Sequence, residues 1–203
     1  MIEIIPQART SVTSVLVLLS CLSFPVTSTA GSATEQVRAT VDRVLTIVRN
    51  PNAKSKAQIE AQRAQLVELI SPRFDFSEMA KRSLGRHWAG RTPDEQREFV
   101  KVFAALMGRS YADNIESYTT QNVLYIRERK DQNYAQVDTK IVAENGSPLS
   151  INYKMHRVDG EWRIYDLVIE DISVVNNYRS QFDRIIARSS FADLVQTMKE
   201  KQS

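Results

Sequence analysis

The sequence predicts an α+β fold in which helices pack on one face of a curved, four-stranded antiparallel sheet. Apolar residues recur at helical spacing from residue 35 to residue 118, the period changes from 3.6 to 2 after Gln121, and helical spacing returns from Val175. Helices and strands that are segregated along a chain are typical of the α+β class. The 203 residues suit a single domain, because 42% of them are apolar and can form one core.

The first thirty residues differ from the rest of the chain. An apolar run at residues 15–19 follows Arg9, and small residues at 28–30 provide a site for signal peptidase. We therefore expect residues 1–30 to be a secretory signal peptide and residues 31–203 to form the mature domain. The apolar run is shorter than the roughly 20 residues that a transmembrane helix needs.

Cys21 leaves a second processing route open. The sequence Leu-Leu-Ser-Cys at residues 18–21 approximates a lipoprotein-processing box, which would place a lipid anchor on Cys21. The other interpretation is that Cys21 is an ordinary small apolar residue of the signal core. Removal of residues 1–30 also removes the only cysteine, so we expect no disulfide in the mature protein and a periplasmic location.

The charge balance argues against a nucleic-acid partner. The net charge is +3, and it stays +3 without residues 1–30 because that segment carries one base, Arg9, and one acid, Glu3. A surplus this small does not indicate a nucleic-acid surface.

Three shorter helices precede a long one. The first two are expected at residues 35–50 and 59–70, and a proline follows each of them. The third begins after Asp75, which can act as its N-cap because Glu78 lies three residues further on, and it should end near Gly85.

The long helix begins at Thr92, where a threonine cap, Pro93 in the first turn and Glu95 form a start signal. Its apolar stripe consists of Phe99, Val102, Phe103, Leu106, Met107, Tyr111, Ile115 and Tyr118. Helical spacing at the C-terminus predicts two more helices, at residues 175–186 and 191–198, separated by a break at Ser189 and Ser190.

Four strands are predicted at residues 123–129, 134–143, 149–158 and 162–172. Apolar and polar residues alternate in the second and third strands, as in half-buried strands of an antiparallel sheet. A three-residue, bulged loop around residues 144–146 aligns their apolar rows, whereas a two-residue loop would put the rows on opposite faces. The pairs that this loop predicts are Ile141 with Leu149 and Val137 with Tyr153.

The same loop type at Asp159 and Gly160 predicts that Tyr153 faces Tyr165 and that Ile151 faces Leu167. The apolar row of the fourth strand would then be Tyr165, Leu167 and Ile169. The opposite row, Trp162, Ile164 and Val168, would lie under the C-terminal helices or under a partner. The first strand remains open between an inward row of Val123 and Tyr125 and one of Leu124 and Ile126.

The sequence shows little that could perform catalysis. It has no Gly-rich phosphate loop and no Gly-x-Ser-x-Gly elbow, and its two histidines, His87 and His156, do not predict a metal site. We expect no metal and no cofactor. The best acid–base candidates are Tyr165 and Asp166, with Glu170 and Asp171 nearby, and they define the alternative of a small hydrolase or isomerase. By the predicted register Asp166 points away from the apolar face, so a solvated carboxylate is the competing interpretation.

The apolar rows predict a shared interior. Its expected members are Phe103, Leu106, Tyr111, Val137, Ile141, Ile151, Tyr153, Met155, Tyr165, Leu167, Ile169 and Tyr178. The pattern does not distinguish a filled core from a hollow one.

Residues 74–118, FDFSEMAKRSLGRHWAGRTPDEQREFVKVFAALMGRSYADNIESY, resemble the MlaC family of periplasmic phospholipid-binding proteins. The resemblance continues through VDTKI at 137–141, GEWRIYDLVIE at 160–170 and NYRSQF at 177–182, and covers essentially the whole mature chain. It implies a non-enzymatic monomer that holds phospholipid acyl chains in an apolar cavity. It also implies lipid exchange between an outer-membrane lipoprotein complex and an inner-membrane ABC transporter, in a system for outer-membrane lipid asymmetry and toluene tolerance.

Under this resemblance the shared interior becomes the lining of the lipid cavity, and no residue is catalytic. Arg179 is the candidate for the headgroup phosphate, with a solvated helix arginine as the alternative. Two departures concern loops: Asp171 stands where a glycine is expected, and Arg188-Ser189-Ser190 lacks one. An adaptor with a solid core is a third hypothesis beside the carrier and the enzyme.

Overall fold

The computed structural model describes residues 31–49, 55–116, 122–142 and 148–200. The proposed signal peptide and Cys21 lie outside these residues. The helices are α1 (Ala33–Val48), α2 (Lys56–Ile70), α3 (Phe76–Leu84), α4 (Pro93–Glu116), α5 (Val174–Arg188) and α6 (Phe191–Glu200), with short 3-10 turns η1 (Ser71–Arg73) and η2 (Gly85–His87). The strands are β1 (Asn122–Asp131), β2 (Tyr134–Val142), β3 (Leu149–Val158), β4 (Glu161–Ile169) and β5 (Ile172–Ser173).

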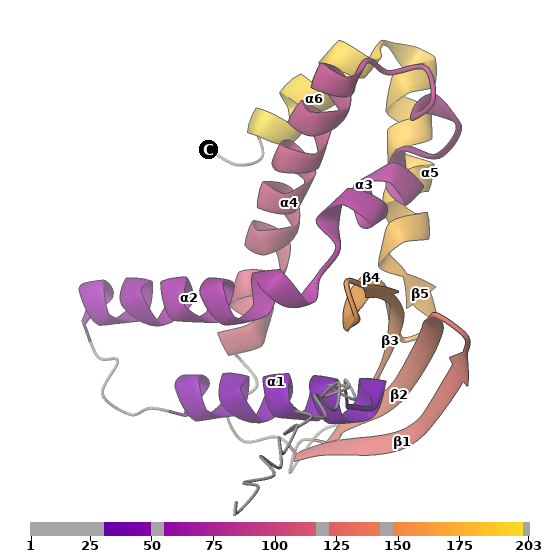
Figure 1. Ribbon diagram of the computed structural model, residues 1–203. Helices are drawn as coiled ribbons and strands as arrows, with labels where there is room; N and C mark the ends of the chain where they lie inside the picture. Colours follow the sequence, from indigo (N-terminus) through magenta and orange to yellow (C-terminus); the bar gives the residue numbers. More distant parts are fainter. Residues whose placement is uncertain (1–30, 50–54, 117–121, 143–147, 201–203) are drawn as a thin grey trace, which may run out of the picture.

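The α+β prediction is confirmed, with one more strand than expected. The strands form a single antiparallel sheet in the order β1-β2-β3-β4-β5. The additional strand, β5, is only two residues long and pairs Ile172 with Ile169 across a two-residue turn. Figure 1 shows the curved sheet beside α1, with α2 above α1 and with α3, α4, α5 and α6 grouped at the other end of the molecule.

Polar side chains begin the helices where the sequence predicts. Asp75 accepts a hydrogen bond from the Glu78 amide at 2.9 Å and starts α3. At α4, the Thr92 amide donates to the Glu95 carboxylate at 2.8 Å while the Glu95 amide donates to the Thr92 hydroxyl at 3.3 Å. The hydrogen bond from the Thr92 amide lowers the pKa of Glu95. None of the helices in the described part of the chain has the length and apolar content needed to cross a bilayer.

The register of the central hairpin agrees with the sequence prediction. Ile141 faces Leu149 and Val137 faces Tyr153. The loop around residues 144–146 lies outside the described residues. At β1 the structure resolves the open alternative, because Leu124 and Ile126 are 51% and 56% exposed, whereas Tyr125 packs against the inner face of the sheet.

The predicted register of β3 and β4 is wrong. The hairpin has a two-residue loop, because Val158 pairs with Glu161 and both Asp159 and Gly160 have positive φ, of 51° and 84°. The additional residue is accommodated inside the strand, where the register shifts between Lys154 and Met155. Beyond this irregularity Tyr153 faces Leu167, and Ile151 faces Ile169.

The irregularity changes which face the first half of β4 presents. Trp162 and Ile164 pack with Met155 on the inner face, and not in the outward row predicted for them. Tyr165 lies on the outer face, where its ring is 5.4 Å from the His156 ring and 4.3 Å from the Arg82 guanidinium. Its predicted place in the interior is therefore wrong, and burial against these neighbours raises its pKa.

Two separate apolar clusters stabilise the described part of the fold. The larger is formed by α3, α4, α5 and α6, where the ring of Phe99 packs 6.2 Å from Phe103 and 5.7 Å from Phe182. The smaller joins α1 to the inner face of the sheet and contains Ala33, Val37, Ala135, Val137, Met155, Trp162 and Ile164. Leu167 and Phe74 pack against both clusters.

Candidate functional site

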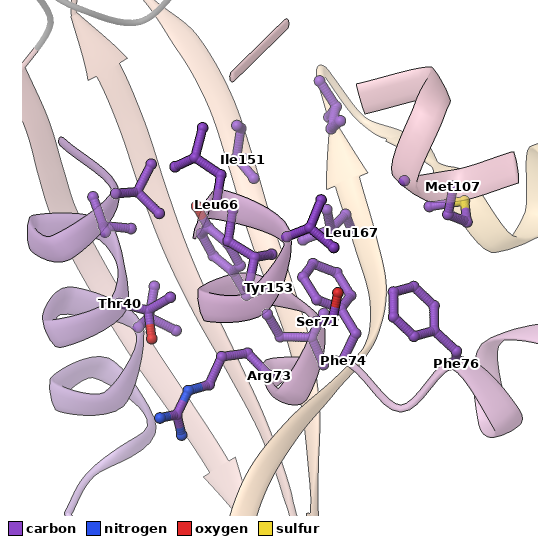
Figure 2. A pocket seen from close by; sticks show the side chains of 18 of the residues that line it. Thr40, Leu66, Ser71, Arg73, Phe74, Phe76, Met107, Ile151, Tyr153 and Leu167 are labelled. Atoms are coloured by element: carbon purple, nitrogen blue, oxygen red, sulfur yellow. The ribbon is translucent and has the colours of Figure 1, made fainter. Parts of the chain in front are cut away.

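A cavity of about 970 Å³ lies between the helices and the inner face of the sheet. Its apolar wall comes from α1 (Val37, Val41, Val44, Leu45), α2 (Leu66, Val67, Ile70), the entry to α3 (Phe74, Phe76), α4 (Ala104, Ala105, Met107, Gly108) and the sheet (Val123, Ile141, Leu149, Ile151, Tyr153, Met155, Ile164, Leu167, Ile169). Figure 2 shows Leu66, Phe74, Ile151, Tyr153 and Leu167 directed toward a common space.

The N-terminal end of α1 is fixed to the sheet by side-chain hydrogen bonds. The Gln36 side chain donates to the Trp162 carbonyl at 2.5 Å and accepts from the Trp162 amide at 3.2 Å. The Thr34 amide and hydroxyl donate to the Glu128 carboxylate at 2.9 and 2.6 Å. Further along α1, apolar side chains such as Val44 remain only partly buried, because they face the cavity and not a packed core.

The volume suits a large apolar ligand. Sites for small molecules usually enclose about 300–1,000 Å³, so this cavity lies at the upper end of that range. A methylene group takes up about as much space as a water molecule, roughly 30 Å³, so the cavity has room for about 30 methylene-sized groups.

Half of the sequence-predicted interior residues line this cavity. They are Ile141, Ile151, Tyr153, Met155, Leu167 and Ile169. Phe103 and Leu106 are buried in the helical cluster, and Val137 in the sheet cluster, without being among the lining residues. Tyr178 packs against Phe103, with ring centroids 5.6 Å apart. Tyr111 belongs to α4, but its side chain is outside the described part of the structure.

Arg179 lies in a different region of the molecule. Its Nε donates to the Arg82 carbonyl at 2.7 Å, and its methylene groups pack against Gly85. It is not among the residues that line the cavity.

Sequence reasoning missed the contribution of α1, α2 and the turn after α2. The apolar positions Val41, Val44 and Leu66 were recognisable from their helical spacing. Their function as a cavity wall depends on the distance between α1 and the sheet, for which the sequence has no signal.

The polar residues in the described wall of the cavity are basic or neutral. They are Gln36, Thr40, Arg63, Ser71, Arg73 and Arg109, and no carboxylate stands among them. The guanidinium of Arg38, on α1, stacks 4.0 Å from the ring of Tyr125, on β1. Burial, with a smaller contribution from the nearby Asp42 carboxylate, raises the pKa of Tyr125 to about 12.

The acid–base candidates do not meet in the cavity. Asp166 points away from it, as expected, but is 4% exposed and so is not solvated. The Asp166 carboxylate accepts hydrogen bonds from the Ser173 hydroxyl at 2.7 Å and the Val175 amide at 3.0 Å, and lies 3.4 Å from the Lys154 ammonium. This carboxylate therefore holds the start of α5 against β4. Each histidine is paired with one aspartate, and no cluster in the described residues could hold a metal ion.

The two departures from the family pattern differ in geometry. Asp171 has φ of 63° and Glu170 has φ of 45°, so the turn between β4 and β5 has the left-handed backbone that favours glycine. Ser189 has φ of −139° and its hydroxyl donates to the Ile185 carbonyl at 3.0 Å, so the break before α6 has no such requirement.

A family model and two named proteins are similar to this chain over most of its length. A family model described as MlaC protein matches residues 38–200. The intermembrane phospholipid transport system binding protein MlaC of Haemophilus influenzae is 21% identical over 89% of this chain and 88% of its own. The toluene tolerance protein ttg2D of Pseudomonas putida is 22% identical over 86% of this chain and 81% of its own.

A solved structure shows a similar fold. The phospholipid-binding protein from Ralstonia solanacearum, determined in complex with a phospholipid, superimposes with a TM-score of 0.72 and 28% sequence identity. The match covers 85% of this chain and 97% of that one.

Proposed function

The chain belongs to the MlaC family, and from this premise we propose that it is a phospholipid-binding protein of a lipid transport system. The cavity is the observation that carries the proposal. The cavity has a volume of about 970 Å³, and most of the residues that line it are apolar, with six polar residues among the described lining. Such a wall suits acyl chains and offers little to a polar substrate.

The energetics of an apolar cavity fit reversible transfer. Burial of about 30 methylene groups from water would give a gross gain of about 24 kcal/mol, which exceeds the ceiling of about 20 kcal/mol observed for any affinity. In a membrane, however, the acyl chains already lie in hydrocarbon. The cavity therefore offsets the cost of extraction and does not drive it, so lipid can move in either direction.

The finer proposal is a shuttle in the periplasm. The name of the Haemophilus relative describes an intermembrane phospholipid transport system, and the name of the Pseudomonas relative describes toluene tolerance. By analogy, the mature monomer exchanges lipid with an outer-membrane lipoprotein complex and an inner-membrane ABC transporter. This route requires export, for which residues 1–30 are the proposed signal.

The same geometry argues against the enzyme hypothesis. Tyr165 lies on the outer face of the sheet, and Asp166 is occupied by the start of α5. Neither group is placed to act on a molecule in the cavity. A carrier without a catalytic residue is therefore the better interpretation.

Mass spectrometry of an organic extract from the purified protein tests the proposal. We expect about one phospholipid per chain. Ala104→Trp, in the cavity wall on α4, should reduce that amount, whereas Ala39→Trp, on an exposed position of α1, should not. A clean extract from the wild-type protein would refute the carrier. Turnover of an ester substrate would then support the hydrolase, and its absence the adaptor.

A further inference from the structure

We propose that Arg73 binds the phosphate group of the phospholipid and so determines which end of the cavity the headgroup occupies. The inference rests on the proposed function and assigns a residue and an orientation within that site. It starts from the uneven distribution of polar groups along the cavity wall.

Four of the six polar lining residues belong to α1 and η1. Gln36 and Thr40 are one helical turn apart on α1, while Ser71 and Arg73 are the two ends of η1. The start of β4 brings the two elements together, because Gln36 is bonded to the backbone of Trp162 and Arg73 lies 4.0 Å from the adjacent Glu161. Figure 2 shows Thr40 and Arg73 near each other at the lower left of the view, with Ser71 between Tyr153 and Phe76. The cavity therefore has a polar end.

Arg73 has hydrogen-bonding capacity left over at this end. Its Nε is buried and has no hydrogen-bond partner among the described residues. The Glu161 carboxylate is too distant for a hydrogen bond, is 57% exposed, and lies equally close to Arg163, at 3.9 Å. One exposed carboxylate thus faces two guanidinium groups, and a surplus positive charge remains beside the cavity.

A phosphate diester supplies the negative charge and the hydrogen-bond acceptors that this arrangement lacks. A guanidinium presents its N–H groups as a planar fork, which matches two phosphate oxygens in a bidentate contact. Such a contact would satisfy the buried Nε–H, which otherwise loses its hydration without replacement. The apolar wall supplies the complementary surface for the acyl chains.

The other two cavity arginines fit this role less well. Arg63 and Arg109 occupy exposed positions on α2 and α4, and each already interacts with another group of the chain. With the headgroup at Arg73, the acyl chains extend along β3 from Met155 toward Leu149. The six residue steps between them span about 20 Å at roughly 3.4 Å per step.

A binding experiment with three lipids of identical acyl chains tests this orientation. Protein freed of copurified lipid is titrated with phosphatidylglycerol, phosphatidylcholine and diacylglycerol that carry the same fluorescent chain. Arg73→Gln should weaken binding of both phospholipids by about 10- to 100-fold, as expected for lost charge-assisted hydrogen bonds, and leave diacylglycerol binding unchanged. Arg73→Lys, which keeps the charge but not the fork, should have an intermediate effect.

Arg184→Gln, at an exposed position of α5 that is not part of the described cavity wall, is the matched control, and it should change all three affinities by less than about threefold. The inference is overturned if Arg73→Gln binds phospholipids as the wild-type protein does, if it weakens diacylglycerol equally, or if Arg184→Gln shows the selective loss instead. Thermal unfolding of each variant tests whether the fold is intact. If Arg73→Gln does not fold, the affinities of Arg73→Lys for phospholipid and for diacylglycerol are compared in its place. If the wild-type protein binds none of the three lipids, the proposed function fails as well.

Discussion

A glutamate in place of Ile151 would put a carboxylate against the acyl chains of bound lipid. Ile151 lines the cavity from β3, between Thr139 on β2 and Ile169 on β4. Water hydrates the carboxylate while the cavity is empty, so Ile151→Glu should fold. Bound lipid removes that water, and an unpaired carboxylate in hydrocarbon takes up a proton. The pKa of the new carboxyl is therefore raised in the lipid complex.

The ordinary pKa of a glutamate sets the size of the effect. At pH 7, protonation of a group whose free pKa is about 4.3 costs about 3.7 kcal/mol, so lipid affinity should fall by about 500-fold. Because the pKa is raised in the complex, the complex is favoured at low pH and lost as the pH rises. Affinity should recover about tenfold for each pH unit between about pH 7 and about pH 4.3.

The assay measures phospholipid per chain after purification, followed by titration of the lipid-free variant with a fluorescent phospholipid at several pH values. Ile126→Glu is the matched control, because Ile126 lies on the outer face of β1 and is 56% exposed. It should bind lipid like the wild-type protein at every pH. Wild-type affinity of a folded Ile151→Glu variant at pH 7 would show that β3 does not face the lipid.

Three further substitutions test other features of the structure. Asp171→Gly should raise the free energy of unfolding in urea by about 1 kcal/mol, because φ at this residue is 63°. A free energy of unfolding below that of the wild-type protein would contradict the left-handed backbone at this turn. Asp166→Asn should lower it by about 2 kcal/mol, because the carboxylate holds the Val175 amide and the Ser173 hydroxyl; full stability would show that these bonds contribute nothing. Tyr125→Phe should leave the free energy of unfolding unchanged or slightly higher, because the hydroxyl is buried without a partner in the described structure. The substitution should also remove a phenol that titrates at about pH 12 when followed by ultraviolet absorbance. A clear loss of stability would show that the hydroxyl makes a hydrogen bond after all.

The sheet shows how far alternation alone can determine register. Side chains alternate with a period of two, so the buried rows of β2 and β3 allow only one arrangement in which both face inward, and that arrangement is present. At the next hairpin, one additional residue can lie either in the loop or inside β4. In both arrangements Leu167 and Ile169 point inward. The sequence therefore predicted these two residues correctly. It misplaced Trp162, Ile164 and Tyr165, which lie between the two possible positions of that residue.

The cavity wall was harder to predict than the fold. The stripe on α4 faces two apolar regions, and Phe103 packs in the helical cluster while Met107 also reaches the cavity. Spacing along one helix defines its apolar face but not the neighbour that covers it. Arg73 gives no periodic signal at all, because it lies in a three-residue turn, and its position at the cavity depends on the path of the chain between α2 and α3.

The cluster formed by Phe99, Phe103, Phe182 and their neighbours is filled entirely by the chain's own side chains. Its packing does not depend on a ligand in the cavity, which lies beside the cluster and, in the described part of the chain, shares only Met107 with its buried residues. The helices of this cluster can therefore hold their arrangement in the lipid-free protein. We expect the free protein to stay folded when lipid is extracted from it.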